Sequence, residues 1–253
     1  MVIGNASPTS QINNELYHQL GERWYTAQDD PVALLRAESR TRNPWVADLI
    51  RQHFTANDTP ILDIGCGGGF LSNHLAQAGF RVMGLDASAG SLRIAQRYDA
   101  TSSACYVEGN AYHLPYDAET FQAVCAMDFL EHVEAPAIVV AEAARVLRPG
   151  GLFFFATFNR NFISWLIGIK GVEWFVKNTP PRMHELSLFI KPAELRAMCQ
   201  ANDLRVRELH GFSPVINRAF WRMLATGVVG DDFRFRFVRH TIMGYLGVAV
   251  KAG

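Results

Sequence analysis

A glycine-rich turn between an expected strand and an expected helix constrains the fold of this chain more than any other stretch. The strand is predicted over 61–64, where Ile-Leu-Asp-Ile forms a short apolar run of the length typical of a buried strand. Glycines follow at positions 65, 67, 68 and 69, and an apolar helical pattern predicts a helix over 68–78. Glycine lets a backbone approach a ligand closely and adopt torsions that a Cβ atom would forbid. We therefore expect this turn to bind a nucleotide cofactor.

The residues around the turn indicate which nucleotide it binds. A dinucleotide fingerprint, G-x-G-x-x-G, would need a glycine where this chain has Phe70. A phosphate-binding Walker loop would need a lysine, and none occurs between positions 60 and 80. The next predicted strand, 81–85, leads to Asp86, whose carboxylate suits the two hydroxyls of a ribose. The pattern D-x-G-x-G-x-G that begins at Asp63, with an acid about twenty residues later, resembles the S-adenosylmethionine site of Rossmann-like methyltransferases.

Composition excludes some partners and favours a compartment. The 253 residues carry a formal net charge of +0, which argues against bulk nucleic acid as a partner. Cysteines occur at 66, 105, 125 and 199 without C-x-x-C spacing, so we interpret them as small core residues of a protein in the reducing cytoplasm. The polar N-terminus has no apolar core of a signal peptide, and no run of eighteen apolar residues occurs. We expect a soluble, cytoplasmic protein that is able to contact the inner face of a membrane.

From residue 60 the predicted strands and helices alternate, which favours a single α/β domain with a parallel sheet covered on both faces. The strands are predicted over 61–64, 81–85, 104–108, 121–127, 152–157, 204–210 and 241–250. Further helices are predicted over 88–98, 136–147 and 192–202. Two insertions, 159–183 and 212–240, interrupt the order and are expected to form a lid or contact region.

Residues 1–57 are predicted to form a helical cap, which Pro31 and the pair Asn43-Pro44 break into pieces. Two interpretations of this cap remain open. It is either a helical layer packed beside the sheet, or a lid over cofactor and substrate. In the second case its aromatic side chains face the pocket, namely Tyr17, Trp24 and Tyr25.

Two polar stretches follow strands at the edge where a ligand should bind. Asn110 and Ala111 come after the third strand, where methyltransferases of this kind usually carry an acid that holds the adenine amine. The oxygen of Asn110 can accept one such hydrogen bond without bringing a charge. After the fourth strand come Asp128, Glu131 and His132, at a spacing that places them together if the segment turns as a helix. They could hold a divalent cation, or His132 alone could remove a proton, or the histidine merely packs.

The first insertion contains a fifteen-residue apolar segment, 162–176, which Asn161 could cap as a helix. As a helix it would be roughly 22 Å long, too short to span a bilayer. Lys170, Glu173 and Lys177 fall on one stripe, leaving an apolar remainder that bears Trp165, Trp174 and Phe175. Three interpretations stay open: a helix in a membrane interface, a lid over an apolar substrate, or a plain core helix.

The order of several motifs narrows the resemblance. LDIGCGGG, GLDAS, DFLEHV, RVLRPGG, FNRN and H-x(5)-IKPAEL follow one another along the chain. Together they resemble the ubiquinone-biosynthetic O-methyltransferases, which methylate ring hydroxyls of polyprenylated catechols and hydroquinols. NRN at 159–161 and the stretch 190–192 are the narrowest of these signals, because a whole superfamily shares the glycine turn.

The resemblance implies a Rossmann-like class I fold, with a seven-stranded and mostly parallel sheet, that transfers a methyl group from S-adenosylmethionine to a phenolic oxygen. It implies that the cofactor contacts Gly65, Asp86 and Met127. The residue pattern predicts four further cofactor residues, which are Asp63, Gly67, Asn110 and Ala111. The implied substrate is a small prenylated aromatic molecule. Two rivals remain: an O-methyltransferase for a secondary-metabolite aromatic, and a non-catalytic protein that binds S-adenosylmethionine.

The resemblance also implies a divalent cation such as Mg²⁺, held by Asp128, Glu131 and His132. In that case the cation would stabilise the phenolate, and without it His132 would be the base. This chain departs from the family pattern in two places. The first acid is Asp128 where the family more often has Glu, and an arginine expected just after Asn43-Pro44 is absent, although Arg42 is close.

Overall fold

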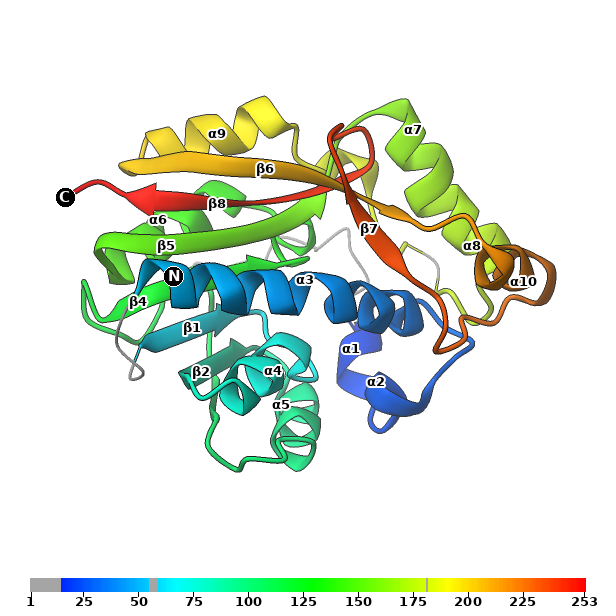
Figure 1. Ribbon diagram of the computed structural model, residues 1–253, viewed down its shortest axis with the longest axis horizontal. Helices are drawn as coiled ribbons and strands as arrows, with labels where there is room; N and C mark the ends of the chain where they lie inside the picture. Colours follow the sequence, from blue (N-terminus) through cyan, green and yellow to red (C-terminus); the bar gives the residue numbers. More distant parts are fainter. Residues whose placement is uncertain (1–14, 55–58, 181) are drawn as a thin grey trace, which may run out of the picture.

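The computed structural model describes residues 15–54, 59–180 and 182–253, which form one mixed sheet with helices on both faces (Figure 1). Within these residues the sheet has eight strands in the order β3-β2-β1-β4-β5-β8-β6-β7. Their bounds are β1 Pro60–Ile64, β2 Arg81–Asp86, β3 Cys105–Glu108, β4 Phe121–Met127, β5 Leu147–Phe158, β6 Leu204–Pro214, β7 Phe235–Val238 and β8 Gly244–Lys251. The prediction of a mostly parallel α/β sheet is confirmed, and the predicted number of seven strands is one too low.

The additional strand is β7, which comes from the second predicted insertion and pairs antiparallel with β6. Phe235 stacks on Phe212 with ring centroids 5.1 Å apart, and Phe237 lies edge-on to the same ring at 5.6 Å. Such aromatic pairs across neighbouring strands stabilise their pairing. The aromatic residues that mark this insertion in the sequence therefore extend the sheet.

Parallel pairing sets where a ligand can bind. β1 pairs with β2 and β4, β2 with β3, and β4 with β5, all in parallel, whereas β8 is antiparallel to β5 and β6. The carboxyl ends of the parallel strands therefore lie at one edge of the sheet, where open α/β sheets form their ligand crevices.

Apolar clusters attach helices to each face of the sheet. On one face, α3 (Val32–His53) and α4 (Phe70–Gln77) pack onto the strands through Val46, Ile50 and Leu75. On the other face, α6 (Pro136–Val146) and α9 (Pro192–Gln200) pack through Val139 and Leu195. Helix α5 (Ala89–Arg97) follows β2, and the short helices α1 (Glu15–Gln19) and α2 (Arg23–Thr26) precede α3.

Helix α3 is continuous over 22 residues, so the prediction that Asn43-Pro44 breaks it is wrong. A proline inside a helix removes one backbone hydrogen bond and costs ~3 kcal/mol. Here both halves of the helix are held by burial, with Ala37 and Val46 each 0% exposed. Asn43 also donates from Nδ2 to the carbonyl oxygen of Phe70 at 2.8 Å. Tertiary packing on both sides of the proline offsets the local cost. Residues 1–14 and 55–57 of the predicted cap lie outside the described residues.

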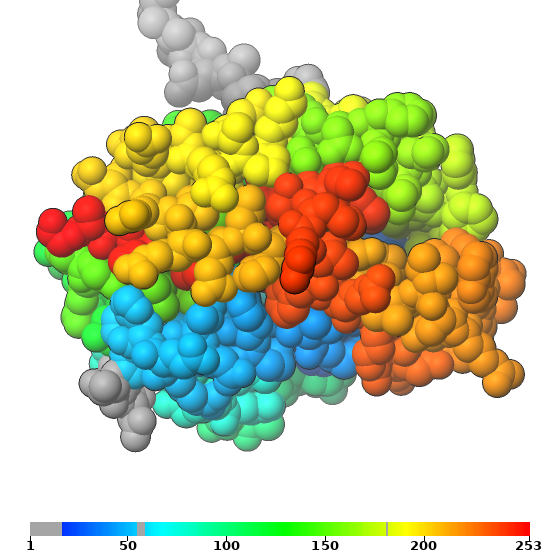
Figure 2. All heavy atoms as spheres, turned by 45° about the horizontal axis from the view of Figure 1, so that its top comes forward, coloured from blue at the N-terminus to red at the C-terminus, as the bar shows by residue number. Residues whose placement is uncertain are grey.

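The first insertion is helical throughout 162–175, as α7 (Phe162–Ser164), a π-helical segment (Trp165–Gly171) and α8 (Val172–Phe175). The predicted cap is confirmed, because Asn161 accepts a hydrogen bond through Oδ1 from the Ser164 N–H at 3.0 Å. The second insertion contributes α10 (Arg218–Thr226), and the two insertions lie side by side at one end of the molecule (Figures 1 and 2). An apolar cluster joins them through Val176, Ala219 and Met223.

Three cysteines, at 66, 125 and 199, are buried as predicted, and all four are free thiols. Cys105 is exposed, which corrects its assignment to the core, because it begins β3 at the edge of the sheet. Within the described ranges, no helix combines the length and the apolar character needed to cross a membrane.

Candidate active site

A cavity of about 1110 Å³ opens at the carboxyl ends of β1, β2 and β4. Helices α1 to α3 supply one wall, and the helical first insertion and α10 close the opposite end. Most of its surface is apolar. The structure brings all the residues predicted to bind the cofactor into its lining, namely Asp63, Gly65, Gly67, Asp86, Asn110, Ala111 and Met127.

The torsions of the glycine turn explain its composition. Gly65 and Gly67 have φ angles of +68° and +52°, in the left-handed region that favours glycine. A Cβ atom on Gly65 would overlap the ring of Phe129, and one on Gly67 would lie 2.7 Å from the indole of Trp24. The turn therefore presents bare backbone to the cavity, between two aromatic rings.

Asp86 ties the end of β2 to this turn. Its Oδ2 accepts a hydrogen bond from the Gly67 N–H at 2.9 Å, and its Oδ1 accepts one from the Ser88 N–H at 2.8 Å. Burial raises the pKa of this carboxyl group above its ordinary value. Each oxygen of a carboxylate has more than one acceptor site, so both can still accept from ribose hydroxyls.

Two other predicted cofactor residues, Asp63 and Asn110, already form hydrogen bonds within the protein. Asp63 accepts a hydrogen bond from the Ser72 hydroxyl at 2.6 Å, and burial raises its pKa to about 7. Asp63 thereby fixes β1 against the first turns of α4. The Asn110 oxygen accepts from the Tyr112 N–H at 2.9 Å, which leaves one lone pair for an adenine amine. Contact of these side chains with the cofactor stays a prediction.

The turn after β4 places Asp128 and His132 in the cavity wall. Asp128 has φ +51°, uncommon for a residue other than glycine, and its carboxylate forms an ion pair with the guanidinium of Arg42. His132 lies edge-on to Tyr17, with ring centroids 5.5 Å apart, and its ring is 5.3 Å from that of His184. Burial, together with His184, lowers the pKa of His132 to about 3. The imidazole is therefore neutral at physiological pH, which is the form in which a histidine acts as a base.

The predicted metal ligands do not assemble in this structure. Glu131 is 1% exposed and is not among the cavity-lining residues, whereas Asp128 forms an ion pair with the guanidinium of Arg42. Burial and the neighbouring Asp128 raise the pKa of Glu131 to about 8. Across residues 15–54, 59–180 and 182–253, no group of three His, Cys, Asp or Glu side chains is arranged to hold a metal ion. The donor set present does not fit a three-ligand cation site.

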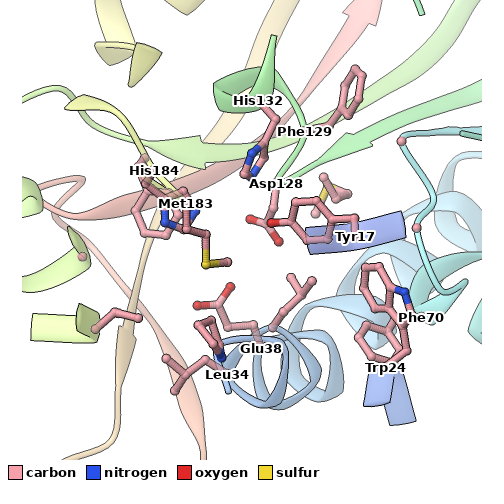
Figure 3. A pocket seen from close by; sticks show the side chains of 18 of the residues that line it. Tyr17, Trp24, Leu34, Glu38, Phe70, Asp128, Phe129, His132, Met183 and His184 are labelled. Atoms are coloured by element: carbon pink, nitrogen blue, oxygen red, sulfur yellow. The ribbon is translucent and has the colours of Figure 1, made fainter. Parts of the chain in front are cut away.

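Glu38 and His184 are polar residues of the cavity lining to which the sequence assigns no role. Glu38 projects from α3 toward Asp128, across the cavity from His132 and His184 (Figure 3). Burial, together with Asp128, raises the pKa of Glu38 above its ordinary value. The sequence signal for Glu38 is weak, since it lies on a helix that the pattern assigns to a cap. His184 has a better signal, because it opens the motif H-x(5)-IKPAEL.

Residues 62–155 match the family model described as a methyltransferase domain. The chain is 34% identical over 229 residues to the ubiquinone biosynthesis O-methyltransferase of Hahella chejuensis, an alignment that covers 89% of this chain and 92% of that protein. It is 36% identical over 219 residues to the protein of the same name from Hydrogenovibrio crunogenus, covering 85% and 88%.

A solved structure supports the fold. The magnesium protoporphyrin IX methyltransferase (ChlM) from Synechocystis PCC 6803, with bound SAH, is similar with a TM-score of 0.62. The match covers 94% of this chain and 97% of that one at 17% sequence identity, so it bears on the fold alone.

Proposed function

This chain belongs to the ubiquinone biosynthesis O-methyltransferase family and uses S-adenosylmethionine, and we propose that its acceptor is a ring hydroxyl of a polyprenylated phenol or catechol. The observation that carries the proposal is one continuous cavity with two different ends. Gly67 and Asp86 line the end at the glycine turn, and Leu166, Val172 and other apolar residues of the first insertion line the far end. A nucleoside cofactor suits the first end, and a long hydrocarbon tail suits the second.

The proposed reaction is an in-line displacement between these two ends. The hydroxyl proton passes to the neutral imidazole of His132, and an electron pair of the oxygen forms the new bond to the methyl carbon. The bond from that carbon to sulfur breaks, and its electron pair stays on sulfur to give S-adenosylhomocysteine. Tyr17 and His184 contact the His132 ring and hold its orientation. Because the donor set does not fit a cation, no step is assigned to one.

The helical first insertion suits both a lid and a membrane contact. Residues 166–168, 171–172 and 174–176 line the cavity, which supports the lid interpretation. The same segment exposes large apolar side chains to solvent, with Phe162 67% and Trp174 64% exposed. Trp221, on neighbouring α10, is 61% exposed. We propose that this end of the molecule rests on the membrane that holds the prenylated substrate.

A matched pair of acceptors tests the proposed function. Two catechols with the same ring, one bearing a polyprenyl tail and one without it, would be incubated with S-adenosylmethionine and the products identified by mass spectrometry. Since each buried methylene contributes ~0.8 kcal/mol, the tailed acceptor should have the higher kcat/KM by at least about tenfold. Equal kcat/KM values would favour a secondary-metabolite O-methyltransferase. Cofactor binding without methylation of either acceptor would favour a non-catalytic protein.

A further inference from the structure

Arg42 is a buried cation in the wall of the cavity. It projects from the middle of α3 and is 5% exposed. Its guanidinium forms an ion pair with Asp128, and its Nη1 lies 3.6 Å from Oε2 of Glu38, one helical turn earlier. Its Nε makes no hydrogen bond to any described residue. A guanidinium has five N–H donors, so the group has unused donor capacity beside Asp128.

Acidic side chains near the Arg42 guanidinium keep it positively charged. Burial acts to lower the pKa of Arg42, but Asp128 and Glu38 outweigh it, so the pKa lies above its ordinary value. Glu38 and Glu131 are the other two acidic side chains that act on this guanidinium. The Arg42 guanidinium and its partner Asp128 therefore lie together in the cavity wall.

The Arg42 guanidinium disfavours binding of a divalent cation to Asp128. Asp128 is the first residue of the ligand set that the family resemblance implies, and it already neutralises Arg42. A cation bound to Asp128 would lie beside a buried positive charge, where the low dielectric strengthens repulsion. Glu131 is 1% exposed and is not among the residues that line the cavity. The shorter Asp128 side chain, which departs from the family pattern, here forms an ion pair with Arg42.

We propose that the Arg42 guanidinium takes the place of a divalent cation in this chain, so that methyl transfer proceeds without a metal. The inference rests on the proposed function. As the hydroxyl proton moves to His132, negative charge develops on the acceptor oxygen. The unused N–H donors of Arg42 stabilise that charge, as preorganised donors do at other oxyanions. Asp128 holds the guanidinium in position.

The first test measures metal dependence in the full-length protein. Wild-type protein freed of metal with EDTA should retain its rate within about twofold, and Mg²⁺, Mn²⁺ or Zn²⁺ should not raise it. Mn²⁺ alone, followed by electron paramagnetic resonance, should show no tight binding to the wild type. Loss of activity in EDTA with recovery on Mg²⁺, or tight Mn²⁺ binding, would overturn the proposal. The Mn²⁺ measurement needs no substrate, so it stands even if neither catechol is methylated.

The second test removes the guanidinium. Arg42→Met should lower kcat by about 10²–10³-fold, the effect of losing one preorganised oxyanion donor, while the Kd for S-adenosylmethionine changes little. Arg42→Lys, which keeps the charge, should lower kcat less. This variant still tests the inference if Arg42→Met fails to fold. Arg40→Met is the matched control, since Arg40 is exposed on the same helix outside the cavity lining. A raised Kd for the cofactor with unchanged kcat would instead assign Arg42 to cofactor binding.

A third test changes Arg42 and Asp128 together. Arg42→Met combined with Asp128→Glu removes the positive charge and restores the longer acid. This double variant should bind Mn²⁺ that the wild type does not bind, by the same resonance measurement. If both proteins bind Mn²⁺ equally well, the guanidinium does not decide metal binding and the inference fails. If the wild-type protein methylates the catechol but stops doing so in EDTA, the proposed function stands and only the metal-free reaction fails.

Discussion

The indole of Trp24 lies on Gly67, so close that a Cβ atom there would approach the ring to 2.7 Å. Trp24 is 3% exposed, stacks with Tyr17 at 5.8 Å and lies edge-on to Phe70 at 5.6 Å. Because Trp24 comes from α2, the N-terminal helices cover the turn that the cofactor must approach. We infer that these helices act as a lid as well as a packing layer.

Removing the indole should loosen the bound cofactor. Trp24→Ala should speed dissociation of S-adenosylmethionine at least about tenfold, a change of ~1.4 kcal/mol, measured by stopped-flow fluorescence or competition. Trp221→Ala is the control, because Trp221 is 61% exposed on α10 and lies outside the cavity lining. Equal dissociation rates for the Trp24 variant and the wild type would leave α2 as a packing element only.

The ribose role of Asp86 predicts a loss of cofactor affinity. Asp86→Ala should weaken S-adenosylmethionine binding by about 1.5–3 kcal/mol, the range for hydrogen bonds to charged groups, as measured by calorimetry. Asp99→Ala is a matched control, since Asp99 also accepts backbone hydrogen bonds, from Thr101 and Ala104, but lies outside the cavity lining. The control should lose stability without losing affinity. Wild-type affinity in the Asp86 variant would remove this residue from the ribose role.

The buried imidazole predicts an unusual pH profile. A catalytic base works in its neutral form, so its activity falls as the pH drops through its pKa. Burial lowers the pKa of His132 to about 3, with His184 adding to the shift, so protonation of His132 should cause no fall in kcat/KM between about pH 7.5 and about 5.5. His132→Gln should lose ~10²–10⁴-fold in kcat. A fall in the wild-type rate centred near pH ~6.5, the value of a free histidine, would contradict this prediction.

The exposed apolar surface of the first insertion predicts membrane binding. Phe162→Glu combined with Trp174→Glu should reduce flotation of the protein with anionic liposomes and leave the cofactor Kd unchanged. Both side chains are more than 60% exposed, so the fold should tolerate the change. Ile138→Glu is the control, because Ile138 is 49% exposed on α6, which packs on the sheet away from the insertions. Flotation equal to that of the wild type would remove this segment from membrane contact.

Local patterns in the sequence determined the cofactor end of the molecule. A short apolar run, glycines and a following acid predict β1, the turn and Asp86, because each depends on neighbours within a few residues and on the carboxyl-edge rule of parallel sheets. The structure places every one of these residues in the cavity. The cap at Asn161 was predictable for the same reason, since an N-cap depends on the next three residues.

Contacts between distant segments decided what the local patterns could not. Pro44 stays inside a helix because burial on both sides outweighs one lost hydrogen bond. The expected cluster of Asp128, Glu131 and His132 follows from spacing alone, but the fold turns Glu131 into the core and sets Arg42, 86 positions away from Asp128 in the chain, against that acid. Whether a group of acids holds a metal depends on the charges that tertiary structure brings beside it, and no spacing within one segment encodes them.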